Sequence, residues 1–352
     1  MINDEPKLAA LLPLLQAADW IAIDTEADSL HAYPEKLCVL QISITGRDEL
    51  IDPLTGLSLD PIWPVLRKHE LILHGADYDL RLLRRSFGFV PQRIFDTMLA
   101  ARFLGYTEFS LVSLLAAKLS VELEKGPQKM DWARRPLTER MERYARNDTR
   151  YLRPLAELLR GELEAKGRLA WHSETCSQLI TDTSQAKKLD NESVWRVRGS
   201  DRLTPKALAI LRELWHWRES EALEANKPPY FVLSHEHLVN LAAQAEHSHA
   251  PLHLPKLSAR RQASLLGALE RGRNVPSSEY PARRENKGRR LTRAEQTRSD
   301  ELRGRRDRIG AELGIDPALI ASRATLAALA QKGQAEAQNL MGWQRQLLFG
   351  KI

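Results

Sequence analysis

The sequence predicts an α/β domain with a mixed sheet at the N-terminus, followed by all-α domains. Two observations predict this fold class. Short apolar segments alternate with helical segments in the first hundred residues, which is typical of an α/β domain. After residue 160, the apolar residues recur only at helical spacings. The chain has 352 residues, of which 43% are hydrophobic and 28% charged, so it is long enough for two or three domains.

Composition argues against several classes of protein. The longest apolar run, at residues 8–15, is short and contains Pro13, so neither a membrane span nor a signal peptide is predicted. We therefore expect a cytoplasmic protein. Cys38 and Cys176 form no C-x-x-C motif, which argues against a disulfide framework and a thiolate zinc site. The formal net charge of +6 favours a polyanionic partner.

The first elements alternate in a way that predicts the sheet topology. Three strands joined by short connections predict an antiparallel meander. Two further strands are separated by helices, which predicts parallel pairing for them. The predicted strands cover residues 20–26, 37–44, 49–52, 71–74 and 94–95. The predicted helices of this region cover residues 8–18, 63–69 and 77–87.

The first strand brings two carboxylates to one point. Side chains alternate along an extended strand, so Asp24 and Glu26 lie on the same face, about 7 Å apart. Two acids at the end of an apolar strand repel each other unless a cation lies between them. An isolated pair of this kind is more often a solvated turn, and the rest of the chain must decide between the two interpretations.

Further acidic residues follow other strands. Ligands of α/β domains bind at the carboxyl ends of the strands, and the segment HGADYD at residues 74–79 begins at such an end. Either Asp77 or Asp79 is a candidate for a third carboxylate, and the other would cap the following helix. Asp96 follows the fifth strand in the same way, and we interpret it mainly as a helix cap.

A fourth carboxylate is predicted on the helix that follows Thr138, a suitable N-cap. Tyr144 and Asp148 recur there with leucines as far as Leu159 at spacings of three and four residues, so both are predicted on the buried stripe. Burial of an uncompensated aspartate costs on the order of several kcal/mol. A cation already held by the first two acids would compensate this charge.

Together these motifs resemble the ribonuclease D family. The order D-x-E, H-G-A-x-x-D, D-W-x-x-R-P-L-T and Y-x-x-x-D-x-x-Y-L is similar to that of the DEDD exonucleases in which a tyrosine precedes the last aspartate. The resemblance implies a ribonuclease H-like exonuclease domain, and it selects Asp79 over Asp77. It assigns the four carboxylates and the tyrosine to Asp24, Glu26, Asp79, Asp148 and Tyr144.

Four acids around one point can hold two divalent cations, Mg²⁺ or Mn²⁺, about 4 Å apart. One ion is predicted between Asp24, Glu26 and Asp148, where it would lower the pKa of a bound water. The other is predicted near Asp24 and Asp79, where it would stabilise the leaving oxygen of a phosphodiester. Tyr144 is predicted to orient the attacking water. The resemblance implies the 3′→5′ direction and the release of 5′-mononucleotides.

Four other side chains are candidates for contact with substrate. One lies in the HGADYD segment, and three lie in the polar loop before the helix of Asp148, where a solvated surface explains them equally well. These candidates are His74, Lys125, Gln128 and Arg135.

The helical half of the chain also resembles known modules. Thr204 and Pro205 open a helix as cap and first residue, and Ser234 caps another. This region resembles the HRDC domain, which ribonuclease D shares with RecQ-type helicases. A basic run follows from Arg283 to Arg308. Two interpretations stay open for it: it binds the phosphates of a nucleic acid, or it forms a solvated linker and helix face. The expected parts are an exonuclease domain at 1–165, a helical connector at 166–200, an HRDC domain at 201–280, and a basic segment with a second HRDC-like domain at 281–352.

The sequence therefore predicts a metal-dependent 3′→5′ exoribonuclease acting on RNA with a free 3′ end. The resemblance implies tRNA precursors as substrates, and no feature indicates an obligate protein partner. A DNA exonuclease of the Werner-like branch shares the motifs, and a nucleic-acid-binding adaptor with an inactive domain is the alternative outside the enzymes. The intact acids and Tyr144 argue against the adaptor. The choice of RNA over DNA depends on contacts to the 2′-hydroxyl, which the sequence does not identify.

Overall fold

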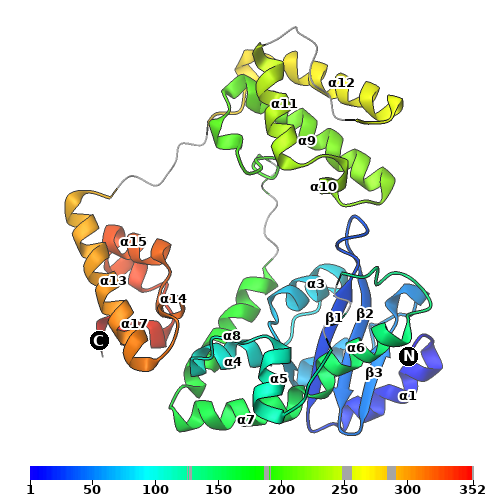
Figure 1. The fold of residues 1–352 in the computed structure, drawn as a ribbon, viewed down its shortest axis with the longest axis vertical. Coiled ribbons are helices and arrows are strands. Elements are labelled where there is room, and N and C mark those ends of the chain that lie inside the picture. The colour runs from blue at the N-terminus through cyan, green and yellow to red at the C-terminus, as the bar shows by residue number, and fades with distance from the viewer. Residues whose placement is uncertain are drawn as a thin grey trace. The chain divides into compact units, whose positions relative to one another are not determined.

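The computed structural model divides the chain into two compact units (Figure 1). Unit 1 comprises Met1–Ala27, Leu37–Gln185 and Arg290–Ile352, and unit 2 comprises Asp28–Lys36 and Ala186–Arg289. Within the described parts of both units, no helix has the length and the apolar character needed to cross a membrane. The structure describes residues 1–124, 126, 129–185, 190, 192–247, 256–283 and 291–350.

A five-stranded mixed sheet lies at the centre of unit 1, in the order β3-β2-β1-β4-β5. The first three strands pair antiparallel, β4 pairs parallel with β1, and β5 pairs parallel with β4. Both the predicted meander and the predicted parallel pairing are confirmed. The strands are β1 (Ile21–Ala27), β2 (Leu37–Ile44), β3 (Arg47–Ile51), β4 (Glu70–Leu73) and β5 (Arg93–Asp96).

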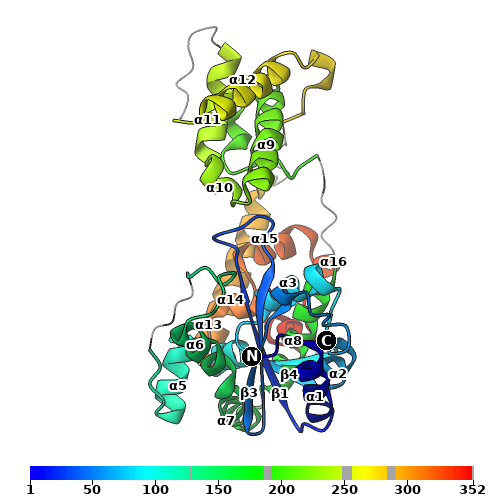
Figure 2. The same cartoon turned by 90° about the vertical axis from the view of Figure 1, so that its right-hand side faces the viewer.

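Helices cover both faces of this sheet (Figure 2). Ile21 and Ile23 of β1 pack on one face with α1, α2 and α3. Ala22 faces the opposite side, where α4 and α7 pack on the parallel strands, α5 packs on α7, and α6 packs on β1 and β2. Asp24 and Glu26 alternate with the same period as Ala22, so β1 directs both toward the face that α6 covers. These helices are α1 (Glu5–Gln16), α2 (Trp63–Lys68), α3 (Asp77–Phe87), α4 (Thr97–Leu104), α5 (Leu111–Leu119), α6 (Glu139–Arg150) and α7 (Leu152–Ala165).

The helix predicted after Thr138 is two helices, so the prediction of one continuous stripe was wrong. Thr138 caps α6 as expected, but Tyr151 ends α6 and begins α7, with φ −99° and ψ 1°. Leu155 and Leu159 of α7 pack with β4 and β5, whereas α6 packs on β2 and β3. The spacing of apolar residues continues through the break because spacing alone does not report a change of helix direction.

The helix α8 (Leu169–Ser184), part of the predicted connector, packs on α3 and β5 within unit 1. It also contacts the C-terminal helices. Arg168, at its N-terminus, donates to the carbonyl oxygens of Phe103 at 2.6 Å and Leu313 at 2.7 Å. Trp171 stacks on Trp343 with ring centroids 5.4 Å apart. The C-terminal helices therefore share an apolar core with the sheet domain.

In the described part of unit 2, four α-helices surround an apolar core that includes Leu208, Leu211 and Trp195. Thr204 caps its first helix and Pro205 is the first residue, as the sequence predicts. The helices are α9 (Pro205–Ala225), α10 (Pro229–Val232), α11 (His235–His247) and α12 (Ala259–Arg273).

The C-terminal helices repeat local features of unit 2. Arg218 of α9 is buried and donates to the carbonyl oxygen of Leu233, 15 residues further along. Arg306 of α13 is buried and donates to that of Ala321 at the same separation. Both α9 and α13 have 21 residues and a threonine N-cap. The helices are α13 (Arg293–Leu313), α14 (Pro317–Ile320), α15 (Arg323–Lys332), α16 (Gln334–Ala337) and α17 (Gly342–Phe349).

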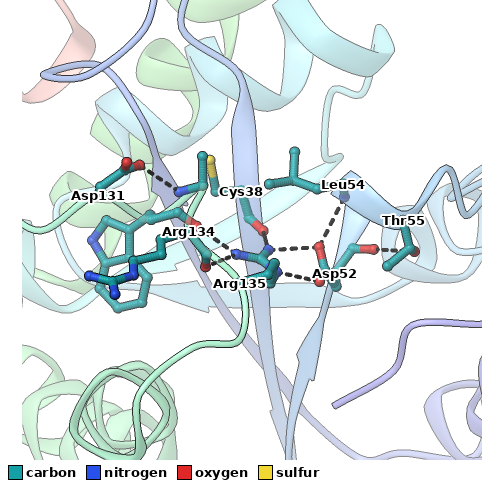
Figure 3. A network of polar contacts seen from close by, with 9 residues as sticks. Cys38, Asp52, Leu54, Thr55, Asp131, Arg134 and Arg135 are labelled. Carbon is teal, nitrogen blue, oxygen red and sulfur yellow. Dashed lines mark hydrogen bonds and ion pairs between the residues drawn. The ribbon is translucent and has the colours of Figure 1, made fainter.

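Arg135 connects the loop before α6 to the sheet region by hydrogen bonds (Figure 3). Its guanidinium donates to both carboxylate oxygens of Asp52, at 2.5 and 2.7 Å. It also donates to the backbone carbonyl oxygens of Cys38, Trp132 and Arg134. These bonds use all five N–H groups that a guanidinium has. These contacts give Arg135 a structural role and leave no N–H group of the guanidinium for a phosphate in this structure, and its contact with substrate stays a prediction.

Removing this guanidinium should destabilise the fold. Asp52 is 2% exposed, and Arg135→Gln would leave its carboxylate buried without a compensating charge. Breaking a buried pair of this kind costs about 3 kcal/mol. Urea unfolding of the wild type and Arg135→Gln would measure the loss, and adding Asp52→Asn to the variant should recover part of it. Unchanged stability with weaker RNA binding would instead return Arg135 to the substrate site.

Candidate active site

Three of the four predicted carboxylates converge where α6 packs on β1. One carboxylate oxygen each from Asp24, Glu26 and Asp148 lies within 4.8 Å of the other two. Asp24 and Glu26 come from β1, and Asp148 comes from the last turn of α6. All three side chains are partly exposed, so a ligand from solvent can reach them.

The fourth carboxylate belongs to Asp79, in the first turn of α3. It is 6% exposed and accepts a hydrogen bond from the hydroxyl of Thr25, which lies between the two acids of β1. Asp77 lies on the surface of the same helix and pairs with Arg81. The structure therefore places Asp79, and not Asp77, beside the cluster. The predicted cap was wrong, because Ala76 is the N-cap of α3 and no side chain caps this helix.

Burial and mutual repulsion raise the pKa of every acid in the cluster. Burial, reinforced by the charge of Asp148, raises the pKa of Asp24 to about 8. Burial and the neighbouring acids raise the pKa of Glu26 to about 10, and burial raises that of Asp148 to about 7. The pKa of Asp79 also lies well above its usual value, mainly because of burial. Negative charge here is costly unless a cation balances it.

Tyr144 lies one helical turn before Asp148 and donates a hydrogen bond to its carboxylate, which partly offsets the rise of that pKa. The tyrosine ring packs against Trp132, with centroids 6.1 Å apart. Gly126 lies so close to the ring that a Cβ there would be 1.6 Å from a ring carbon. Only glycine fits this position. Lys125 and Gln128, two predicted substrate contacts, lie outside the described residues.

His74 supports the turn before α3. Its Nδ1 is 2.9 Å from the hydroxyl of Thr97, which donates to the carbonyl oxygen of Leu73. Burial lowers the pKa of the imidazole, although the charge of Asp96 and a hydrogen bond to the backbone of Phe109 act in the opposite direction. A neutral ring with these partners holds the turn, so we assign His74 this structural role. Its contact with substrate stays a prediction.

Asp96 is a cap, as predicted, and it also fixes the same turn. Its carboxylate caps α4 by accepting hydrogen bonds from the backbone N–H groups of Met98 and Leu99, at 2.9 and 3.1 Å. It accepts two more from the backbone N–H groups of Gly75 and Ala76, at 3.0 and 2.8 Å. Because this turn begins α3, Asp96 positions the helix that carries Asp79. This second function depends on residues 20 and 21 positions away, which local spacing does not reveal.

Gln41 is a neighbour of the site that the sequence analysis did not single out. It lies on β2, is 0% exposed, and donates from Nε2 to Oδ2 of Asp24 at 3.4 Å. A primary amide inside a wholly buried strand was the signal that could have identified it.

The basic run from Arg283 to Arg308 is only partly described. Arg283, Arg298 and Arg306 each donate to backbone carbonyl oxygens of their own helical region. These guanidinium groups hold helical elements together. A phosphate-tracking role stays a prediction for the other basic residues of this run, of which Arg284, Lys287, Arg289 and Arg290 lie outside the described ranges.

Comparison with known proteins relates both halves of the chain to one family. Residues 1–164 match the sequence model of a family described as 3′-5′ exonuclease, and residues 207–253 match that of the HRDC domain. Ribonuclease D of Jannaschia sp. is 32% identical over 294 residues, which cover 80% of this chain and 76% of that protein. Ribonuclease D of Granulibacter bethesdensis is 29% identical and covers 100% of this chain and 90% of that protein.

Solved structures agree with these relatives. The structure of Escherichia coli RNase D, described as an exoribonuclease involved in structured RNA processing, has a TM-score of 0.79 and 27% identity, covering 99% of this chain and 96% of that one. A protein from Bifidobacterium adolescentis has a TM-score of 0.82 at 21% identity, which shows the fold alone. The predicted ribonuclease H-like exonuclease fold with HRDC-type helices is confirmed. Because the similarity covers the acidic cluster and most of the length of these relatives, the chain belongs to the ribonuclease D family.

Proposed function

We propose that this chain shortens RNA from its 3′ end, releases 5′-mononucleotides, and holds two divalent cations with Asp24, Glu26, Asp79 and Asp148. As a member of the ribonuclease D family, it is a metal-dependent 3′→5′ exoribonuclease. The observation that carries the assignment of residues is the convergence of three carboxylates within 4.8 Å. Such a cluster is otherwise unfavourable in a folded protein.

The donor set fits hard divalent cations. All four side chains offer carboxylate oxygens, which Mg²⁺ and Mn²⁺ prefer, and among the described residues no cysteine or histidine is part of the cluster. Asp24, Glu26 and Asp148 would hold one ion, and Asp24 with Asp79 would hold the other. When bound, such ions lower the pKa of water and balance charge on the leaving oxygen.

Tyr144 has the task of orienting the attacking water. Its hydroxyl is directed at Asp148, and Trp132 and Gly126 restrict the ring. A phenol is a weak base at neutral pH, which argues against proton abstraction by Tyr144 itself. Tyr144 therefore contributes to the reaction by aligning the attacking water through one hydrogen bond.

RNA with a structured body and a free 3′ end is the proposed substrate class, with tRNA precursors as the specific case. The support is the activity named for the Escherichia coli relative, together with an HRDC segment and a formal charge of +6. We also propose that the C-terminal helices form a second HRDC-like domain, because they repeat the buried arginine and the threonine cap of unit 2.

Asp24→Asn should abolish nuclease activity and leave RNA binding nearly intact, because the lost charge serves the cations while affinity comes from contacts with phosphates. The assay is digestion of 5′-labelled RNA and DNA of one sequence, with Mg²⁺ or with EDTA. Wild type should shorten RNA from the 3′ end in Mg²⁺ alone. The matched control is Asp77→Asn on the surface of α3, which should retain activity. Undiminished turnover by Asp24→Asn would disprove the assigned site.

Tyr144→Phe should slow the chemical step by about ten- to a thousandfold, because it keeps the ring and removes one aligning hydrogen bond. The concentration of Mg²⁺ that gives half the maximal single-turnover rate should hardly change, since a neutral phenol is a poor ligand for a hard cation. A strong shift of this midpoint with full recovery of the saturated rate would mean that Tyr144 acts through metal binding.

Without metal, the protein should lose stability as the pH rises. The unfolded acids titrate near pH 4, whereas burial raises the folded pKa of Asp148, Asp24 and Glu26 to about 7, 8 and 10. The contribution of these protonated acids to the stability of the folded protein is complete below about pH 4. It is lost as the pH rises through their folded pKa values. Mg²⁺ should restore the melting temperature, and more so at about pH 9 than at about pH 6.

Thermal unfolding in EDTA and in Mg²⁺ would measure both trends, and Asp24→Asn, which lacks one titrating group, should show a shallower slope in EDTA. A melting temperature in EDTA that stays level or rises over this interval would contradict the prediction.

A further inference from the structure

Gln41 faces the metal site from the neighbouring strand. In the antiparallel pairing of β1 and β2, Gln41 lies directly opposite Asp24. All eight residues of β2 are buried, and the side chain of Gln41 is 0% exposed. A polar amide therefore occupies the centre of a strand whose other neighbours are mostly aliphatic.

Packing does not explain an amide at this position. Among the described residues, Oε1 of Gln41 is buried and has no hydrogen-bond partner. Leaving such a group unsatisfied destabilises a folded protein, so an apolar side chain of the same length would stabilise the fold better. Ser43, two residues further on the same face of β2, differs in this respect. Its hydroxyl is 2.7 Å from both Asp48 and Thr149.

The partner of Gln41 is Asp24. Nε2 donates to Oδ2 of that carboxylate at 3.4 Å. An ionised carboxylate only accepts hydrogen bonds, so the amide must turn its N–H groups toward Asp24. Since Oε1 has no competing partner among the described residues, Asp24 alone determines this orientation of the amide.

We propose that Gln41 is a positioning residue for the metal site: its amide holds one oxygen of Asp24, so that the carboxylate keeps a single orientation toward a cation shared with Glu26 and Asp148. The proposal rests on the proposed function, because it assumes that these acids bind divalent ions. Partners that orient a metal ligand typically contribute about 10- to 100-fold in metal affinity or activity.

Gln41→Met separates positioning from packing. Methionine has nearly the length and volume of glutamine, fills the same space and removes the unsatisfied oxygen. The variant should be as stable as the wild type or more so, and yet bind Mg²⁺ about tenfold more weakly. Gln41→Leu is a second apolar variant, and the same loss is expected in it if Gln41→Met does not fold.

The experiment is a titration of the full-length protein with Mg²⁺ in the absence of RNA, followed by calorimetry, with unfolding measured in EDTA. Ser43→Ala is the matched control, because it also removes hydrogen bonds from the same face of β2 but touches none of the four acids. Its affinity for Mg²⁺ should equal that of the wild type. In a nuclease assay, the half-saturating Mg²⁺ should rise in Gln41→Met while the rate at saturating Mg²⁺ largely recovers.

Equal Mg²⁺ affinity in Gln41→Met and wild type would overturn the positioning role, and the proposed function would stand if Asp24→Asn still lost the metal. Equal losses in Gln41→Met and Ser43→Ala would also overturn it, because the effect would then come from general changes in β2. A wild type that binds no Mg²⁺ would overturn both the positioning role and the proposed metal site.

Discussion

Repulsion among partly buried carboxylates is the constraint on which the rest of this structure depends. One carboxylate oxygen each from Asp24, Glu26 and Asp148 lies within 4.8 Å of the other two. Burial raises the pKa of each of these acids. A chain gains no stability from such an arrangement. The surrounding fold must therefore hold these side chains together in the absence of a cation, and must supply the free energy for doing so from its apolar cores.

The scaffold meets this demand by fixing the elements that carry the acids from several directions. Alternation along β1 places two acids on the face that α6 covers, and apolar contacts on both faces of the sheet prevent β1 from moving. Asp96 ties the start of α3 to the start of α4. Arg135 ties the loop before α6 to Asp52. Asp96 and Arg135 are each satisfied by several hydrogen bonds, in contrast to the cluster itself.

The helical half contains the same local hydrogen bond in two different environments. In α9 and in α13, a buried arginine donates to the carbonyl oxygen that precedes a serine-capped helix. The first copy forms its own core in unit 2, whereas the second shares the core of the sheet domain through Trp343, and Arg168 of α8 bonds to its backbone. The same helical pattern thus yields a separate domain in one case and an extension of the nuclease domain in the other, according to which apolar surface it meets.

Local order along the chain was readable from sequence. The bounds of β2 at Leu37–Ile44 and α3 at Asp77–Phe87 match the predicted ranges, and the period of two placed Asp24 and Glu26 on one face. These features depend on neighbours within a few residues. The tertiary structure decided the break at Tyr151, the partner of Arg135 and the contact of Gln41 with Asp24. They join segments that are distant in sequence, or follow from how those segments pack, and no local period encodes such contacts.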